Sequence, residues 1–157
     1  MVIVLCFLGS GLVGATVIPI FDKTALFARA DMVAEISVGS AKTLRAGPGD
    51  FIHTDSRVVV DRLWFTRGAA SRVRQGEALS LRQIGGRIGD VEHSVAGTAP
   101  LNPGDRVLAF VRYDAGRVYL VGMGQGAYLF MEKGSGTFVA NMFGTRPRLK
   151  PGSVVGQ

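Results

Sequence analysis

The chain has one cysteine, two histidines and one tryptophan in 157 residues, and these shortages exclude several kinds of chemistry. Cys6 lies inside an N-terminal apolar segment, so the folded part is expected to have no disulfide and no reactive thiol. Cysteine nucleophiles, iron–sulfur clusters and thiolate zinc sites are therefore excluded there. No serine stands in the Gly-x-Ser-x-Gly elbow of serine hydrolases.

The two histidines, His53 and His93, stand far apart in the sequence. Both have acidic neighbours, and two imidazoles with a carboxylate could bind zinc if the fold brought them together. No local ligand spacing supports this, and the ordinary alternative is two partly exposed loop histidines. Ser94 follows His93 directly, but adjacent side chains of a strand point to opposite faces, which excludes a catalytic dyad. We expect no enzyme, no metal and no cofactor.

The first residues, 1–21, contain no charged side chain. Their apolar block and the small residues around Ala15 predict a signal peptide, residues 1–15, that is cleaved after Ala15. The positively charged start of a normal signal is missing, so either the start codon is assigned too late or the segment is of another kind. The alternatives are a membrane anchor through residues 2–21 and a soluble cytoplasmic strand.

Two glycine-rich motifs resemble nucleotide-binding loops. Gly9-Ser-Gly11-Leu-Val-Gly14 matches the dinucleotide fingerprint, but that site needs a helix directly after the loop, and Pro19 interrupts it. Gly122-Met-Gly124-Gln-Gly126 precedes a predicted strand, so it fails the same requirement. We expect no nucleotide site.

The formal net charge of +6 permits nucleic acid, anionic lipid or acidic glycan as a partner. The arginines are scattered along the chain rather than packed into one run, so the ordinary alternative is a solvated basic surface. Residues 144–157 carry further cations and are expected to form a flexible basic tail.

Alternating apolar residues and abundant glycine predict a single β-barrel domain over residues 24–143, preceded by a short helical turn within residues 22–30. In the long second strand, strict alternation places Val58 and Val60 on one face and Leu63 on the other. The predicted strands are Met32–Ser40, Ile52–Phe65, Ala78–Ile84, Val107–Tyr113, Arg117–Met123, Gly126–Glu132 and Thr137–Phe143.

Glycines mark the breaks between these strands. Gly85-Gly86 predicts a bulge or sharp bend, and Asp114-Ala-Gly116 predicts a three-residue hairpin loop with glycine in the left-handed position. The polar stretches Arg67–Glu77 and Arg87–Pro100 are predicted to be loops. Six or seven strands with one long, bent member favour an all-β fold, a small Greek-key barrel of OB type, with a β-sandwich as the alternative.

Several short motifs occur in a recognisable order. They are Ala30-Asp31-Met-Val, Ile52-His-Thr54, Val60-Asp-Arg-Leu63, Ile84-Gly85-Gly86, Pro103-Gly-Asp105 and Gly124-Gln-Gly126-Ala. Over residues 24–131 the chain resembles a poorly characterised OB-like β-barrel module of exported bacterial proteins, sometimes found beside secreted hydrolase domains. The resemblance implies an extracytoplasmic, non-catalytic module and carries no active-site residues.

OB-type barrels bind oligonucleotides and oligosaccharides on the face of their second and third strands. On those predicted strands stand Arg57, Arg62, Trp64 and Arg82, which we take as candidate ligand-binding residues, although Trp64 fits a core position equally well. The predicted function is an exported binding or assembly module without catalysis, periplasmic or secreted, whose partner is an envelope protein or an anionic polysaccharide.

The alternative function is an OB-type single-stranded nucleic-acid-binding protein, which would combine the basic groove with aromatic stacking. Export would remove most nucleic-acid partners, so this alternative ranks lower. A membrane would be contacted only through an uncleaved N-terminal segment.

Overall fold

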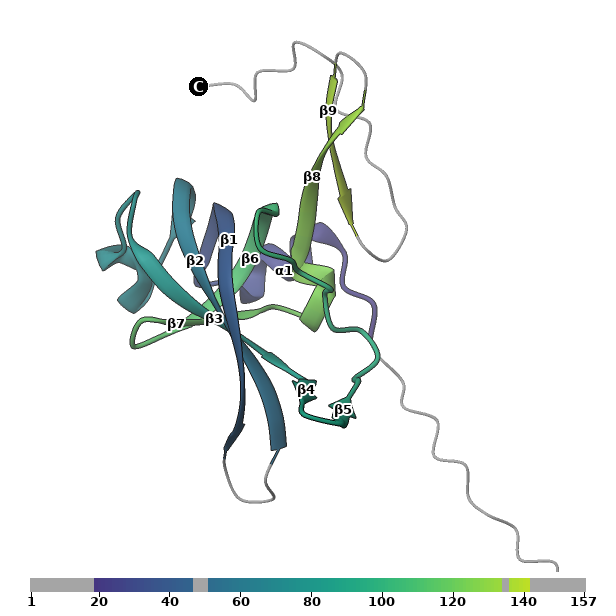
Figure 1. Ribbon diagram of the computed structural model, residues 1–157. Coiled ribbons are helices and arrows are strands. Elements are labelled where there is room, and N and C mark those ends of the chain that lie inside the picture. The colour runs from purple at the N-terminus through teal and green to yellow at the C-terminus, as the bar shows by residue number, and fades with distance from the viewer. Residues whose placement is uncertain (1–18, 47–50, 134–135, 142–157) are drawn as a thin grey trace, which may run out of the picture.

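The computed structural model describes residues 19–46, 51–133 and 136–141. The predicted signal peptide, 1–15, and basic tail, 144–157, lie outside these residues. The all-β prediction is confirmed, since the described chain forms a strongly curled, mixed sheet with one short α-helix (Figure 1). Among the described residues, no helix has the length and apolar character needed to cross a bilayer.

The elements follow one another closely along the chain, and two of the helical ones are single 3-10 turns. In order they are α1 (Lys23–Arg29), β1 (Met32–Ala46), β2 (Phe51–Thr66), η1 (Gly68–Arg72), β3 (Ala78–Ile84), β4 (Gly86–Ile88), β5 (Val91–His93), β6 (Arg106–Asp114), β7 (Arg117–Leu120), η2 (Met123–Gly126), β8 (Ala127–Lys133) and β9 (Gly136–Asn141).

Five strands pair in a closed ring. The order β1-β2-β3-β7-β6 returns to β1, because β6 also pairs with β1 through Met32↔Val111 to Ser37↔Arg106. All these pairs are antiparallel except β3 with β7, which run parallel and share two residue pairs, Ser80↔Arg117 and Leu81↔Val118. β8 pairs with the free part of the β6 edge, and β9 pairs with β8. The ring is thus extended by a projecting hairpin (Figure 1).

The long β1–β2 hairpin bends at three register shifts. Asp61 and Trp64 are extra residues on β2, and on β1 Gly39 and Ser40 together face the single residue Arg57. Such bulges bend a strand and change the face that later side chains occupy. Leu63 therefore packs with the same inner cluster as Val58 and Val60, and the strict alternation predicted for this strand is wrong.

Several predicted boundaries need correction. The first strand does not end at Ser40 but continues to Ala46, because its polar end pairs with Phe51–Ser56 across the hairpin. The fifth strand ends at Leu120, where Gly122 takes the left-handed conformation that starts η2. Residues 87–100 are not wholly irregular, since β4 and β5 form a small hairpin there.

The turn between β6 and β7 is also tighter than predicted. Asp114 pairs with Arg117, so the loop contains two residues, Ala115 and Gly116, rather than three. Both have positive φ, 46° and 85°, which is the pattern of a type I′ hairpin turn. Glycine supplies the second of these conformations without strain, and Ala115 adopts a left-handed one that non-glycine residues rarely take.

Two hydrophobic clusters stabilise the molecule. The inner cluster fills the ring with small aliphatic side chains such as Ile36, Val60, Leu81, Val107 and Val118, all exposed by 1% or less. The outer cluster lies between α1, β6 and the β8–β9 hairpin. It contains Leu26, Ala30, Val33, Val121, Tyr128 and Val139, with Phe21, Phe65, Leu108, Phe110 and Phe130 at its margin.

A buried glutamine attaches the residues before α1 to the outer cluster. The Oε1 atom of Gln125 accepts a hydrogen bond from the backbone N–H of Phe21 at 2.7 Å, and its Nε2 atom donates to the carbonyl of Pro19 at 2.8 Å. The Gln125 carbonyl accepts a further bond from Asn141 at 2.8 Å. One residue, Gln125, thus connects three segments that are distant in sequence, through its side chain and its backbone carbonyl.

Candidate functional site

A hollow of about 470 Å³ crosses the outer face of β1, β2 and β3 and is bordered by the β6–β7 turn. Cross-strand register explains its composition, because Asp55 faces Arg82 and Arg57 faces Ser80 across the β2–β3 pair. All four therefore stand on the outer side of the sheet, opposite the inner cluster. The hollow is lined by Ser40, Ala41, Lys42, Asp55, Arg57, Ala78, Leu79, Ser80 and Gly116.

One of the predicted ligand-binding residues, Arg82, is already engaged. Its Nε and Nη2 atoms donate to the two carboxylate oxygens of Asp55, each at 2.6 Å, in the bidentate geometry of a strong charged pair. The hydrogen bonds from Arg82 hold the pKa of Asp55 below its ordinary value, and Asp55 in turn raises the pKa of Arg82. Arg82 therefore orients the only carboxylate of the hollow instead of remaining free for a ligand.

Arg82 itself is not in the lining, and the two cations that are, Lys42 and Arg57, remain available. Lys42 and Arg57 are exposed, and neither side chain has an ion-pair or hydrogen-bond partner among the residues that the structure describes. Arg117 follows Gly116 at the edge of the hollow and adds a further positive charge, which also lowers the pKa of Asp55. Lys42 and Arg57 thus share the lining of the hollow with one carboxylate that Arg82 already neutralises.

The other two predicted residues form a separate group. The Arg62 guanidinium lies 4.0 Å from the centre of the Trp64 ring, and Trp64 donates from Nε1 to Glu35 at 3.2 Å. Arg106 pairs with the same Glu35 at 3.4 Å. Trp64 is 47% exposed, so its alternative assignment to the core is wrong. Neither Arg62 nor Trp64 lines the hollow, and the four predicted residues do not form one site.

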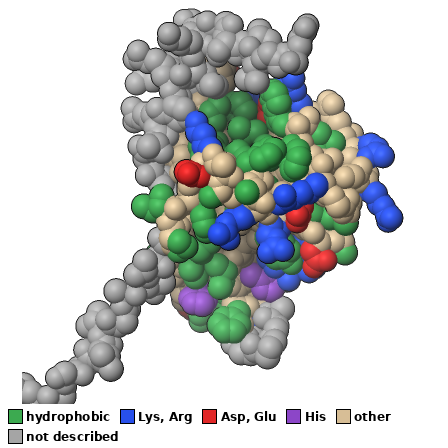
Figure 2. Space-filling view, turned by 180° about the vertical axis from the view of Figure 1, so that it is seen from behind, with side chains coloured by type: hydrophobic (Ala, Val, Ile, Leu, Met, Phe, Trp, Pro, Cys, Tyr) green, Lys and Arg blue, Asp and Glu red, His purple; other side chains and the backbone are tan. Residues whose placement is uncertain are grey.

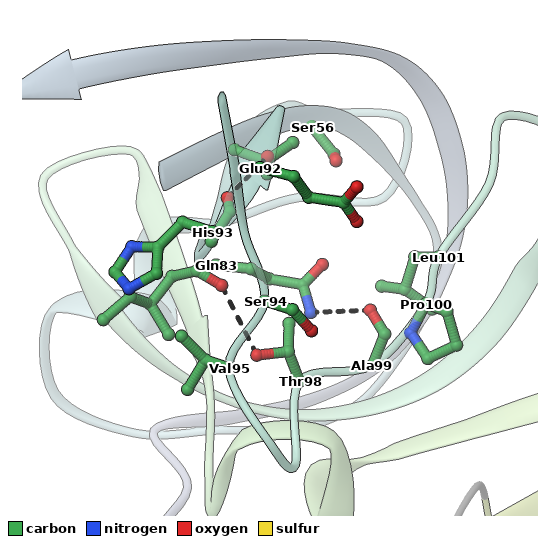
Figure 3. Close-up of a pocket in the computed structure, with 14 residues that line it drawn as sticks. Ser56, Gln83, Glu92, His93, Ser94, Val95, Thr98, Ala99, Pro100 and Leu101 are labelled. Atoms are coloured by element: carbon green, nitrogen blue, oxygen red, sulfur yellow. Dashed lines mark hydrogen bonds between the residues drawn. The ribbon is translucent and has the colours of Figure 1, made fainter. Parts of the chain in front are cut away.

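A second pocket, of about 380 Å³, opens at the end of the barrel beside the β4–β5 hairpin (Figure 3). Two of its polar side chains are engaged in internal hydrogen bonds. Gln83 donates to the Ala99 carbonyl at 3.0 Å, and Thr54 donates to the Gly85 carbonyl at 2.9 Å. Gly86 is required at this place, because a Cβ atom there would lie 2.4 Å from the Thr54 hydroxyl. The pocket is a product of the bend at Gly85-Gly86.

This pocket contains Glu92, His93 and Ser94 in sequence, but not in a catalytic arrangement. Figure 3 shows the Glu92 carboxylate and the His93 ring pointing to opposite sides, as adjacent residues of β5 must. A general base needs to reach its nucleophile at hydrogen-bond distance, and no hydrogen bond joins any two of these side chains within the described structure. The three residues therefore give no support to hydrolase chemistry.

The histidines do not form a metal site either. Figure 2 shows them as two separate purple patches near the lower edge of the molecule. His53 is buried on β2 and His93 is exposed on β5. Within the described residues no three His, Cys, Asp or Glu side chains gather closely enough to hold an ion. The zinc hypothesis required such a gathering and receives no support.

The sequence reasoning missed Lys42 and the role of Asp55. Lys42 was outside the predicted strand, which ended at Ser40, so nothing placed it beside β2, where it pairs with Asp55. Asp55 was visible only as one of several acids, and its pairing with Arg82 depends on a register of strands that pattern alone does not give. An acid and an arginine at outward positions of neighbouring predicted strands are the one signal that could have found this pair.

No protein-family model, curated protein or solved structure matches this chain.

Proposed function

We propose that this chain is an exported, non-catalytic binding module that holds an acidic polysaccharide in the hollow across β1, β2 and β3. The observation that carries the proposal is the pair of free cations, Lys42 and Arg57, in the lining of a hollow whose one lining carboxylate, Asp55, is neutralised by Arg82. Arginine binds carboxylates through paired donors, and lysine adds a mobile positive charge.

The place of the hollow supports an OB-type assignment for the barrel. OB-type folds are five-stranded Greek-key barrels that bind oligomers on the face of the second and third strands, between two flanking hairpin loops. Here the second and third ring strands are β2 and β3, and the hollow is bordered by residues 40–42 of β1 and by the Gly116 turn. A hollow on β2 and β3 is what an OB-type ligand face would require, and this position supports the proposal.

A polysaccharide fits this surface better than the two other partners. Binding of single-stranded nucleic acid combines basic groups with aromatic platforms, and the residues that line the hollow include no aromatic side chain. A protein interface would need large buried anchors, whereas the lining is made of small and polar residues with Leu79 already buried. Serine hydroxyls and cationic groups are suited to sugar hydroxyls and uronate carboxylates.

Binding of alginate, with neutral dextran and oligo-deoxythymidine as comparison ligands, tests this proposal by calorimetry. We expect alginate to bind and dextran not to bind. Replacing both cations, Lys42→Ala with Arg57→Ala, is expected to weaken alginate binding roughly tenfold or more, since charged hydrogen bonds are worth about 1.5–3 kcal/mol each. Arg72→Ala is the matched control, because Arg72 is exposed on η1 and does not line the hollow.

Equal binding of dextran, or an equal loss in the Arg72→Ala variant, would contradict the proposal. Tighter binding of oligo-deoxythymidine with a steep dependence on salt would establish the nucleic-acid alternative instead.

Export is tested separately by fractionating cells and determining the N-terminal residue of the recovered protein. A chain that begins near Thr16 in the periplasm or medium is the expected result. Intact Met1 in the membrane fraction would make the module an anchored one, and intact Met1 in the cytosol would contradict export.

A further inference from the structure

A second cationic pocket lies on another part of the molecule, where the end of α1 meets β6 and the residues after β7. Its volume is about 410 Å³. Three arginines from distant places in the sequence reach it: Arg29 from the last turn of α1, Arg67 from the loop after β2, and Arg112 from β6. The only carboxylate in the lining is Asp31.

The carboxylate of Asp31 is engaged by other groups of the protein. One carboxylate oxygen accepts a hydrogen bond from the backbone N–H of Tyr113 at 3.1 Å, and the other lies 3.6 Å from Nε of Arg67. Its backbone is fixed as well, because the Asp31 N–H donates to the Val111 carbonyl and the Asp31 carbonyl accepts from Arg67 N–H. Asp31 therefore serves as a fixed joint between β1, β6 and the Arg67 loop, and it neutralises only one of three guanidinium groups.

Two of the arginines are held in place by contacts that leave donors free. Arg67 donates from Nη2 to the Ala28 carbonyl at 2.6 Å. Arg29 lies over the ring of Phe21, 4.6 Å from its centre, and a stacked guanidinium still presents its N–H groups at the edge. Phe21 is in turn fixed by Gln125. Preorganised donors of this kind lose little freedom when an anion binds.

Arg112 supplies the unpaired charge. It is exposed, and its side chain has no hydrogen-bond, ion-pair or ring partner among the residues that the structure describes. Like charges around one cavity repel each other, and Asp31 compensates only one of the three guanidinium charges. The two remaining positive charges favour binding of a compact dianion. Phe21 packs closely against Gly122 in the wall of the cavity, since a Cβ atom at Gly122 would lie 2.6 Å from the Phe21 ring.

From this arrangement we infer that the pocket of Arg29, Arg67 and Arg112 binds a phosphate monoester group. A phosphate monoester has a charge near −2 at neutral pH and three acceptor oxygens, which match two uncompensated guanidinium groups with several free N–H donors. This site is separate from the hollow of Lys42 and Arg57, since the two linings share no residue. The chemistry is the same for a soluble phosphorylated metabolite and for the headgroup of a phosphatidic acid.

Titration of the whole protein with glycerol 3-phosphate, followed by calorimetry and by amide NMR shifts, tests the inference. Vesicles of phosphatidylcholine with and without phosphatidic acid form the second arm. Binding of the soluble ester identifies a small-molecule site, and binding only to vesicles with phosphatidic acid identifies a headgroup site. Binding to neither overturns the inference.

The key variants are Arg112→Ala and Arg112→Lys. Because Arg112 is exposed and has no partner within the described structure, its removal is expected to leave the fold intact while it weakens phosphate binding roughly tenfold to a hundredfold. Arg112→Lys should restore only part of the affinity, since lysine keeps the charge but lacks the forked donors. Arg72→Ala again serves as the control of equal charge on an exposed surface.

The pH dependence gives an independent readout. The second proton of a phosphate monoester dissociates near pH 6, so binding is expected to be tighter at about pH 7 than at about pH 5. Equal affinity in the Arg112→Ala variant, or an equal loss in Arg72→Ala, would overturn the inference. The Lys42→Ala, Arg57→Ala variant should lose alginate binding and keep its phosphate binding. This result would show that the two sites bind their ligands independently.

Discussion

The inner and outer hydrophobic clusters differ in the side chains that form them and in the elements that they join. The inner cluster consists mainly of alanine, valine, isoleucine and leucine and has strands on every side. The outer cluster is rich in aromatic side chains and joins a helix, a hairpin and the Phe21 segment to one side of the barrel. Small aliphatic side chains suit the narrow interior of a five-stranded ring, whereas large aromatic rings can cover an open face.

This difference also separates the two proposed sites. The hollow of Lys42 and Arg57 stands on strands whose inner faces fill the ring, so its geometry depends on the inner cluster. The pocket of Arg29, Arg67 and Arg112 has Phe21 and Val121 in its wall, and both belong to the outer cluster. Damage to one cluster should therefore affect one site before the other.

The largest effect is expected from Leu81→Ala in the inner cluster. Leu81 is fully buried on β3 and pairs with Val118 at the parallel junction. Truncation leaves a cavity that the surrounding strands cannot fill, so urea denaturation should show a loss of about 3–5 kcal/mol in the free energy of unfolding. A loss below about 1 kcal/mol would mean that the ring is loosely packed.

Leu26→Ala makes the same chemical change in the outer cluster. Leu26 is 1% exposed, but it belongs to the short helix α1, which can shift to fill part of the space. We expect a smaller loss, about 2–3 kcal/mol, together with faster hydrogen exchange of the Ala30 amide, which donates to the Leu26 carbonyl. The amide of Val60 should keep its protection. Equal acceleration at both amides would show that the two clusters unfold as one unit.

Gln125→Ala sharpens the comparison at a polar contact. The change removes both hydrogen bonds to the Pro19 and Phe21 backbone, and a lost hydrogen bond with a part-buried partner costs about 1–2 kcal/mol. The variant should also bind phosphate more weakly in the pocket of the three arginines, because the Phe21 ring supports Arg29. Its alginate binding should be retained. Unchanged phosphate affinity in this variant would show that Phe21 does not preorganise the pocket.

The smallest effect is expected from Arg82→Met, which breaks the pair with Asp55 on the outer side of β2 and β3. The side chains are 24% and 18% exposed, so the loss should be about 1 kcal/mol near neutral pH. Because the pKa of Asp55 is lowered in the folded protein, its contribution is present above the ordinary carboxyl pKa and disappears as the pH falls through the folded value. The variant should therefore lose less stability on acidification than the natural chain, which denaturation at several pH values would measure.

The sequence predicted strands where the hydrophobic pattern was strong. The bounds of β3 agree with the prediction, and the short helix and the β8–β9 hairpin lie within a residue or two of their expected places. The pattern failed at the end of β1 after Ser40 and in the β4–β5 hairpin. The side chains of residues 41–45 and of that hairpin are mostly exposed, so burial imposes no hydrophobic period there. It also failed at Leu63, because the bulge at Asp61 leaves no clear local signal.

The candidate sites were less predictable than the strands. Arg57 was found because it lies on a long, clear strand, but the engagement of Arg82 and the separation of Trp64 from the hollow depend on cross-strand register. The pocket of Arg29, Arg67 and Arg112 unites residues from three parts of the chain, and only the closed ring and the docked helix bring them together. Scattered arginines in a sequence carry no sign of such convergence.

The parallel junction between β3 and β7 has a consequence for folding kinetics. It contains two residue pairs and one further backbone bond, from Ser80 to Gly116 at 3.1 Å, and its two sides are separated by the whole insertion that contains β4 and β5. Such a closure must overcome loop entropy before its contacts form, so we expect it to follow the local β1–β2 and β6–β7 hairpins in time. Ser80 and Gly116 both border the hollow, and the ability to bind a ligand there should therefore arise only after those local hairpins have formed.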